Sequence, residues 1–344
     1  MEEYVDLPDM MSNYVSTCAK LRRYKNLNNR LVFLKGFSSS IPLIKQAIVD
    51  LRELEGGGMF LSYNGYGIVI DPGINFLQSF HSYGFSLQDI KCVIVTHSHI
   101  DHCADLEKIL ALQYDYNKYV DNQRFANKYS KLERANIKVF CDEITYNKLL
   151  SEHESDKSIE LVEIKGANDY KISKNLTVRF FKVKHDKKCK TYALKISAAG
   201  YKTFGYSSDT HYFKELKDFL ADAELEVLNI SEINDKDFHL KKLKETHLGF
   251  YGCYNLIEKE KPNKRFFISE FCCLKGDNRM SIIKSLRKLS KNDNIYPSSI
   301  GLSVDLYSGD IECTLCGYSS NKSFVLSSGE YKPLMYVCDR CILE

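Results

Sequence analysis

A cluster of metal-binding side chains lies in the first third of the chain. The run THSHIDH contains three histidines and one aspartate, although the whole chain has only 9 histidines. It follows an apolar, strand-like segment and precedes a segment with leucine and isoleucine at helical spacing. Side-chain direction repeats every two residues in an extended turn, so His97 and His99 can reach one ion. Asp101 and His102 open the helix and diverge toward a second ion.

Nitrogen and oxygen ligands of this kind suit Zn²⁺, with Mn²⁺ and iron as alternatives. Two ions about 3.5–4 Å apart can share a hydroxide, which supplies a nucleophile near neutral pH. An ordinary surface or core position would explain a single histidine, but it does not explain this density at the end of a strand. The run therefore predicts a hydrolase with a two-metal centre.

Four cysteines near the carboxyl end form a second metal-binding pattern. Cys313 and Cys316 make one CxxC pair, and Cys338 and Cys341 make another. This spacing is close to that of structural zinc sites held by four thiolates. A ribbon of this size buries too little apolar surface to fold alone, so the ion would supply its folding energy. The pattern predicts one structural Zn²⁺, and four buried free cysteines are the alternative.

The metallo-β-lactamase superfamily carries an HxHxDH signature, and the run at 97–102 is similar to it position by position. Its later motifs are similar to segments of this chain that contain Asp71, His185, Asp209 and His247. The resemblance covers about residues 31–270 and implies an α/β fold, an αββα metallo-β-lactamase sandwich. The cysteine pattern adds a small C-terminal zinc ribbon to this fold.

The resemblance also implies a role for each matching residue. The first ion would be bound by His97, His99 and His185. The second ion would be bound by Asp101, His102 and His247. Asp209 would bridge the two ions, and Asp71 would orient ligands without binding metal itself.

Within the superfamily, the tRNase Z-like phosphodiesterases give the nearest resemblance. Residues 34–42 (LKGFSSSIP) are similar to that branch's LGTGSxxxP opening, and residues 206–210 (YSSDT) are similar to its YSGDT. True tRNase Z commonly carries a long arm for the tRNA elbow, but only 23 residues separate His185 from Asp209 here. Ser231 also stands where the branch's HEAT motif has histidine. The sequence therefore favours smaller phosphodiester substrates over precursor tRNA.

Strands and helices must hold these residues in place. Strand-like segments occur at 31–34, 59–63, 67–70, 92–95, 137–141, 176–183, 191–196, 201–206, 225–230 and 265–269. Helical segments occur at 41–54, after 102, and at 143–150, 212–220, 248–259 and 279–289. Grouped strands followed by strands alternating with helices are typical of two packed sheets with helices outside. The polar segment 117–135 is either a mobile lid or a solvated helix.

The chain of 344 residues can form one large domain with additions. We expect an N-terminal extension at 1–30, a hydrolase domain at 31–300 and a zinc-ribbon appendage at 301–344. The net charge of +3 does not indicate wholesale nucleic-acid binding. The N-terminus has no apolar signal segment and no apolar run is long enough for a membrane span, so we expect a cytoplasmic protein with no membrane partner. Pairing with a second copy as a homodimer stays open.

These features together predict a metal-dependent phosphodiesterase acting on RNA, DNA or a cyclic nucleotide through a metal-bridging hydroxide. The candidate catalytic residues are Asp101, Asp71 and His211. His211 follows the aspartate at 209 and is a candidate proton donor or phosphate contact, with an ordinary surface histidine as the alternative. Two other functions stay open. The site could hydrolyse a lactone, thioester or β-lactam, or the ribbon could bind a nucleic acid or protein partner.

Overall fold

The computed structural model describes residues 28–37, 57–121, 133–153, 156–232, 243–272, 276–327 and 332–342. The expected helix at 41–54, most of the N-terminal extension and the middle of the segment 117–135 lie outside these ranges. None of the helices within them is long and apolar enough to cross a membrane.

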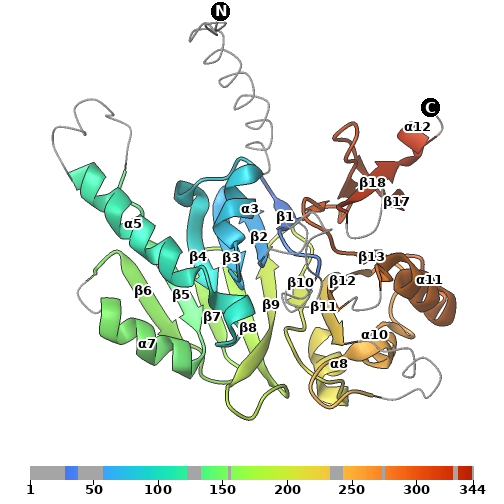
Figure 1. Ribbon diagram of the computed structural model, residues 1–344, viewed down its shortest axis with the longest axis horizontal. Helices are drawn as coiled ribbons and strands as arrows, with labels where there is room; N and C mark the ends of the chain where they lie inside the picture. Colours follow the sequence, from blue (N-terminus) through green and yellow to red (C-terminus); the bar gives the residue numbers. More distant parts are fainter. Residues whose placement is uncertain are drawn as a thin grey trace, which may run out of the picture.

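Two β-sheets form the centre of the molecule (Figure 1). The nine-stranded sheet has the order β16 (Ser319–Ser320), β15 (Ile311–Glu312), β14 (Ser303–Asp305), β1 (Arg30–Phe33), β2 (Met59–Tyr63), β3 (Tyr66–Ile70), β4 (Ile90–Ile94), β5 (Ile137–Cys141), β6 (Ile159–Glu163). The seven-stranded sheet has the order β13 (Ile295–Pro297), β12 (Arg265–Cys272), β11 (Leu225–Glu232), β10 (Phe204–Tyr206), β9 (Thr191–Ala198), β8 (Leu176–Val183), β7 (Asp169–Ser173). Strands β3 to β6 run parallel to one another, as do β10 to β13, so the carboxyl ends in each set share one edge.

Helices cover the outer face of each sheet. The nine-stranded sheet packs against α3 (Phe76–Ser82), α5 (Leu106–Asp121) and α7 (Glu143–His153). The seven-stranded sheet packs against α8 (Lys214–Leu220), α10 (Gly249–Ile257) and α11 (Arg279–Ser290). Short helical turns occur as η2 (Leu87–Asp89), α4 (Ile100–Cys103) and α12 (Asp339–Ile342). The predicted αββα sandwich is therefore confirmed.

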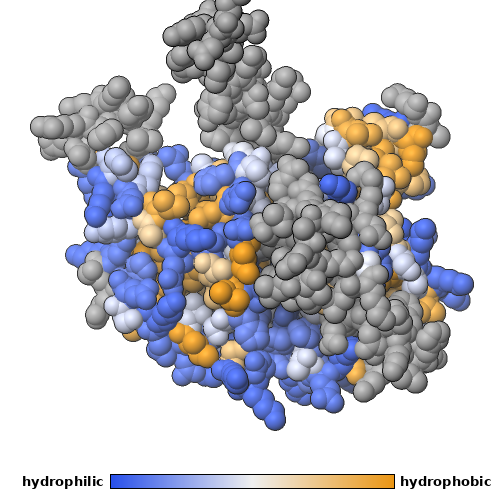
Figure 2. Space-filling view, in the orientation of Figure 1, coloured by the Kyte–Doolittle hydropathy of each residue, from blue (hydrophilic) through white to orange (hydrophobic). Residues whose placement is uncertain are grey.

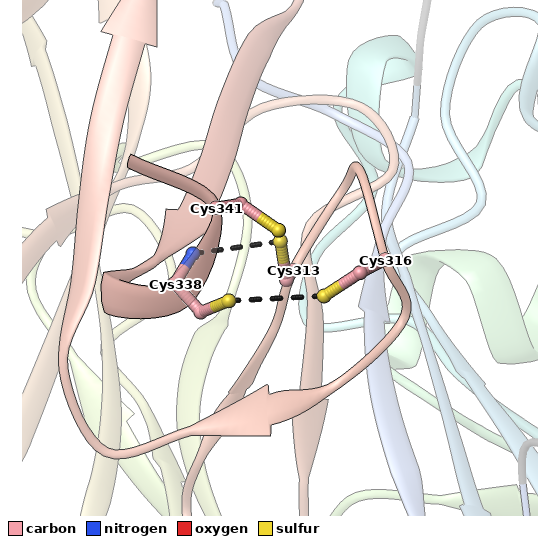
Figure 3. Close-up of side chains that lie close together, drawn as sticks. All are labelled: Cys313, Cys316, Cys338 and Cys341. Carbon is pink, nitrogen blue, oxygen red and sulfur yellow. Dashed lines mark hydrogen bonds between the residues drawn. The ribbon is translucent and has the colours of Figure 1, made fainter. Parts of the chain in front are cut away.

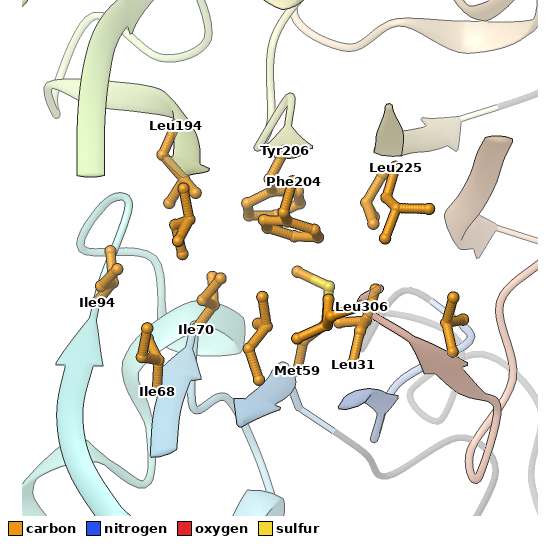
Figure 4. Close-up of a cluster of buried hydrophobic side chains, with 14 of the residues drawn as sticks. Leu31, Met59, Ile68, Ile70, Ile94, Leu194, Phe204, Tyr206, Leu225 and Leu306 are labelled. Atoms are coloured by element: carbon orange, nitrogen blue, oxygen red, sulfur yellow. The ribbon is translucent and has the colours of Figure 1, made fainter. Parts of the chain in front are cut away.

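The burial of alternate residues explains why these strands form layers. On β12, Phe267 points into the core between the sheets, while Phe266 and Ile268 point toward the helices. On β4, Ile94 faces the inner core and Val93 faces the outer helices. Side chains of a strand alternate between its two faces, so a strand buried on both faces is apolar throughout. Figure 4 shows the inner core, where side chains from the two sheets meet.

The C-terminal segment is joined closely to the sandwich. Strand β14 pairs with β1 inside the nine-stranded sheet, and β15 and β16 extend that sheet. Beyond them, β17 (Ser323–Ser327) and β18 (Leu334–Cys338) form a separate hairpin. Leu334 and Tyr336 of β18 are part of the inner core. The hairpin also exposes Phe324 and Leu326, and Figure 2 shows hydrophobic residues gathered over it. Part of the predicted ribbon segment 301–344 is thus continuous with the main sheet.

A buried ion pair lies on the seven-stranded sheet, away from the predicted ligands. Lys264 Nζ and Glu226 Oε2 are 2.6 Å apart, and their side chains are 4% and 1% exposed. Burial raises the pKa of Glu226 to about 7, although Lys264 opposes this rise. The folded protein therefore holds this proton more tightly than the unfolded chain, in which glutamate titrates near about 4.3. Folding stability should fall as the pH rises from about 4 to about 7 because of this group.

We expect Glu226→Gln to remove part of this pH dependence, because glutamine does not titrate. Thermal unfolding would be measured for both proteins at about pH 5 and about pH 8. The midpoint of the original protein should drop more between the two pH values than that of the variant. An equal drop in both proteins would show that Glu226 does not bind the proton that the buried pair implies.

Candidate metal centre

The predicted ligands meet where parallel strands of both sheets end. Four residues at these strand ends adopt the left-handed backbone conformation: Asp71 (φ 51°), Ser208 (φ 53°), Ser231 (φ 51°) and Glu270 (φ 60°). Positive φ is uncommon for residues other than glycine, and residues held in it cluster at functional sites. The backbone is therefore constrained just after β3 and β10, and near the carboxyl ends of β11 and β12.

The first ligand group consists of three imidazoles. His97 Nε2 lies 3.1 Å from His99 Nδ1, and His99 Nδ1 lies 3.2 Å from His185 Nε2. Ligand atoms about 2.1 Å from one ion lie about 3.4 Å apart at a tetrahedral angle. The three nitrogens are therefore spaced closely enough to hold one ion.

The second group surrounds His102. Its Nε2 is buried and has no hydrogen-bond partner. Three carboxylate oxygens lie near this nitrogen: Asp101 Oδ2 at 3.6 Å, Asp209 Oδ2 at 3.6 Å and Glu270 Oε1 at 3.5 Å. A buried polar atom without a partner is costly, so this nitrogen needs a hydrogen-bond partner or a bound ion. This arrangement fits a cation between the four side chains.

Asp209 lies between the two groups. Its Oδ2 is 3.8 Å from His185 Nε2 and 3.6 Å from His247 Nε2, in addition to its contact with His102. Asn229 Nδ2 donates a hydrogen bond of 2.9 Å to the other oxygen, Oδ1. Asp209 Oδ2 therefore lies between His185 of the first group and His102 of the second. The ligand group that contains His247 also contains His185 and Asp209, whereas Asp101 and His102 group with Glu270.

The second nitrogen of several imidazoles is held by a fixed partner. His102 Nδ1 lies 2.8 Å from Asp71 Oδ2, and His185 Nδ1 lies 2.9 Å from the carbonyl oxygen of Thr246. Both partners accept hydrogen bonds, so both Nδ1 atoms donate, and in the neutral rings both Nε2 atoms have a lone pair for metal. The orienting groups needed for ligation are thus present.

Asp71 is the centre of a buried network behind His102. Its carboxylate accepts hydrogen bonds from the backbone N–H and the hydroxyl of Thr96 and from the hydroxyl of Tyr206. Tyr206 in turn accepts a bond of 2.9 Å from Asn229 Nδ2, which also reaches Asp209. Asp71 therefore lies where the sequence placed a ligand-orienting residue, and the network links it to the bridging position.

The electrostatics of this region favour positive charge. Burial opposes the charged form of His102, but Asp101, Asp71 and other nearby carboxylates hold its pKa well above the usual range. Burial, followed by the charge of Asp71, raises the pKa of Tyr206 well above its ordinary value. The tyrosine therefore stays protonated and can donate to Asp71. An excess of buried carboxylates is the environment that a bound cation would neutralise.

Sequence reasoning missed two residues of this centre, Lys35 and Glu270. Both are buried, with only 5% and 2% of their surface exposed. Lys35 Nζ lies 2.5 Å from Glu270 Oε1 and donates a longer bond to the carbonyl oxygen of Asp101. A charged residue at the end of an apolar run of sequence was the available signal in both cases, since charged side chains are rarely buried without a partner.

A cavity of about 560 Å³ opens beside the first group. His185 and His211 line it, together with a lysine-rich loop, residues 182–190 (KVKHDKKCK). His211 is half-buried, and its Nδ1 lies 2.6 Å from the carbonyl oxygen of Glu245. The structure therefore places His211 at the wall of the same cavity as the predicted ligand His185.

The four C-terminal cysteines also come together (Figure 3). Cys316 Sγ lies 3.7 Å from Cys338 Sγ, and the backbone N–H of Cys338 points at Cys313 Sγ at 3.4 Å. All four sulfurs belong to one group spaced for a metal ion. Burial opposes ionisation of Cys313, but N–H groups of Cys338, Cys316 and Leu315 lower its pKa to about 6. A thiolate is the form that binds zinc.

The layered sheets, with histidines and carboxylates gathered at the strand ends, define a protein of the metallo-β-lactamase fold. Two solved structures show the same fold: YhfI from Bacillus subtilis (TM-score 0.59, 14% identity, covering 80% of this chain and 98% of that one) and the short form of human tRNase Z (TM-score 0.54, 11% identity, 80% and 99%). The family model of anti-Pycsar protein Apyc1 matches residues 56–246, more than half of the chain, and the chain belongs to this family.

Sequence relatives carry the same name. The anti-Pycsar protein Apyc1 of Bacillus phage 010DV004 is 26% identical over 166 residues, which are 45% of this chain and 62% of that protein. The chain thus matches less than two thirds of the length of these curated relatives. The predicted metallo-β-lactamase fold is confirmed by these structures, and the family to which the chain belongs is that of Apyc1.

Proposed function

We propose that this protein is a two-metal phosphodiesterase whose substrate is a cyclic nucleotide. The observation that carries the proposal is the pair of ligand groups joined at Asp209. The first ion would be held by His97, His99 and His185. The second would be held by Asp101 and His102, with His247 from the resemblance, and Asp209 would bridge the two.

Each residue around the centre has a task in this reaction. When bound, the ions supply Lewis acidity and a water of lowered pKa as nucleophile. Asp71 fixes His102 in the tautomer that leaves Nε2 for metal, and Thr246 does the same for His185. His211 would donate a proton to the leaving oxygen, since its Nδ1 bonds to the carbonyl oxygen of Glu245 and its ring lines the cavity.

Two features favour a small anionic substrate. The loop 182–190 brings lysines to the wall of the cavity, where they can attract and position a phosphodiester. The chain between His185 and Asp209 contains only the short strands β9 and β10 with their connections, which leaves no arm for a tRNA elbow. Among the substrates considered, membership of the Apyc1 family favours the cyclic nucleotide.

A structural zinc ion in the C-terminal segment is part of the same proposal. Its ligands would be Cys313, Cys316, Cys338 and Cys341, which form one group of sulfurs. These residues belong to the ribbon and the metal-centre ligands do not, so this ion would stabilise the segment and take no part in the reaction.

A substrate panel tests the function. Purified protein would be incubated with cyclic purine and pyrimidine nucleotides, a bis-aryl phosphodiester, a short RNA, a lactone and a β-lactam, with and without chelator. We expect chelator-sensitive opening of a cyclic nucleotide to its linear monophosphate. Hydrolysis confined to the lactone or the β-lactam, or turnover that survives complete metal removal, would refute the proposal.

A further inference from the structure

Glu270 faces the second ligand group from β12, a strand that the superfamily resemblance did not connect with metal binding. Its Oε1 is as close to His102 Nε2 as the oxygens of Asp101 and Asp209 are, at 3.5 Å against 3.6 Å for each. These separations are too long for hydrogen bonds but fit atoms that share one ion. We propose that Glu270 is a ligand of the second ion.

Lys35 holds the Glu270 carboxylate in this position. The backbone keeps the two residues together, because the carbonyl oxygen of Gly36 accepts a bond of 3.2 Å from the N–H of Phe271. Phe37 continues the contact as a parallel bridge to Phe271. Lys35 is therefore fixed beside β12 and supplies the positive charge next to Glu270 when no ion is bound.

The two metal positions then differ in chemistry. The first would have three imidazole nitrogens, whereas at the second three carboxylates, those of Asp101, Asp209 and Glu270, surround His102. Imidazoles suit zinc, and carboxylates suit harder cations such as Mn²⁺ and Mg²⁺. The second position is therefore suited to Mn²⁺, an inference that rests on the two-metal centre of the proposed function.

A matched pair of variants tests the ligand. Protein stripped with chelator would receive one equivalent of Zn²⁺ for the cysteine group and then be titrated with Mn²⁺, with free Mn²⁺ followed by electron paramagnetic resonance. Glu270→Gln should weaken the tighter Mn²⁺ binding by about tenfold to 100-fold or more. Glu226→Gln neutralises another buried glutamate that pairs with a lysine, and it should leave the Mn²⁺ affinity unchanged. Glu270→Asp keeps the charge but withdraws the carboxylate, and it should also weaken binding.

The lysine is tested by its effect on metal-free and metal-loaded protein. Lys35→Met leaves Glu270 without its cation, so it should lower the melting temperature of the metal-free form more than that of the Mn²⁺-saturated form. The bound ion would replace the missing charge. Lys264→Met removes the equivalent cation from Glu226. It should lower the melting temperatures of the metal-free and Mn²⁺-saturated forms by the same amount, because no ion binds beside Glu226.

The outcomes separate this inference from the proposed function. Unchanged Mn²⁺ affinity in Glu270→Gln, or an equal loss in Glu226→Gln, would overturn the role of Glu270. If the original protein still opened a cyclic nucleotide, the function would stand without it. If Glu270→Gln lost Mn²⁺ but no phosphodiester were hydrolysed by the original protein, the ligand assignment would stand and the function would fall.

Discussion

Replacement of Asp209 by alanine should abolish hydrolysis while leaving the protein folded. Asp209 Oδ2 lies within 3.8 Å of ring nitrogens of His102, His185 and His247, so one substitution removes a ligand from both ions. The ions would also lose the negative charge that reduces their mutual repulsion. We expect turnover to fall by about 10³-fold or more, which corresponds to about 4 kcal/mol of lost transition-state stabilisation.

The measurement combines turnover with elemental analysis. The original protein should hold three ions per chain under the proposal, two in the centre and one on the cysteines, and Asp209→Ala should keep the last of these. Asp222→Ala is the matched control, because this aspartate is exposed and pairs with Lys195 outside the centre. Near-normal turnover in Asp209→Ala would show that this carboxylate does not bridge two ions.

Cys338→Ser should have the second largest effect, and it should act on stability. Cys338 is fully buried, and its sulfur lies with those of Cys313, Cys316 and Cys341. Zinc bound by four thiolates contributes about 10–16 kcal/mol of apparent binding free energy to small domains of this type. Loss of one thiolate should therefore remove one zinc per chain, lower the melting temperature and leave measurable turnover.

Cys92→Ala is the control for the loss of a buried thiol. Cys92 lies in the core between the sheets, away from the cysteine group, so the variant should keep all its zinc. Loss of catalysis in folded Cys338→Ser protein that still held both ions of the centre would give the ribbon a role in the active site. Unchanged zinc content in Cys338→Ser would rule out the thiolate site.

Much of the fold could be predicted because its signals are local. The dipeptide Asn64-Gly65 lies between the predicted strands at 59–63 and 67–70 and favours a hairpin turn, and the structure contains this hairpin as β2 and β3. Strands β6 and β7 were not predicted, because charged and partly exposed residues interrupt them. Their pairing depends on neighbouring strands, a long-range contact that a local pattern does not contain.

The ligands were predictable to different degrees. His97, His99 and His102 lie within one short run, so their spacing alone indicated a metal site. The fold brings Glu270 and Lys35 to the same place from residues far apart in sequence, and each is a single charged residue beside an apolar strand. A single residue of that kind does not distinguish a metal ligand from a structural ion pair, so only the folded structure connects them.

The position of β14 determines when the large sheet can be completed. Arg30 of β1 pairs with Asp305 of β14. One edge of β1 therefore finds its hydrogen-bond partners only in residues near the other end of the chain. During synthesis, β1 would leave the ribosome long before β14 and would expose unpaired N–H and C=O groups until β14 arrived. A shortened gene product ending before Ser303 would keep that edge open permanently. Such a product should aggregate through β1 even though it retains every ligand of the metal centre.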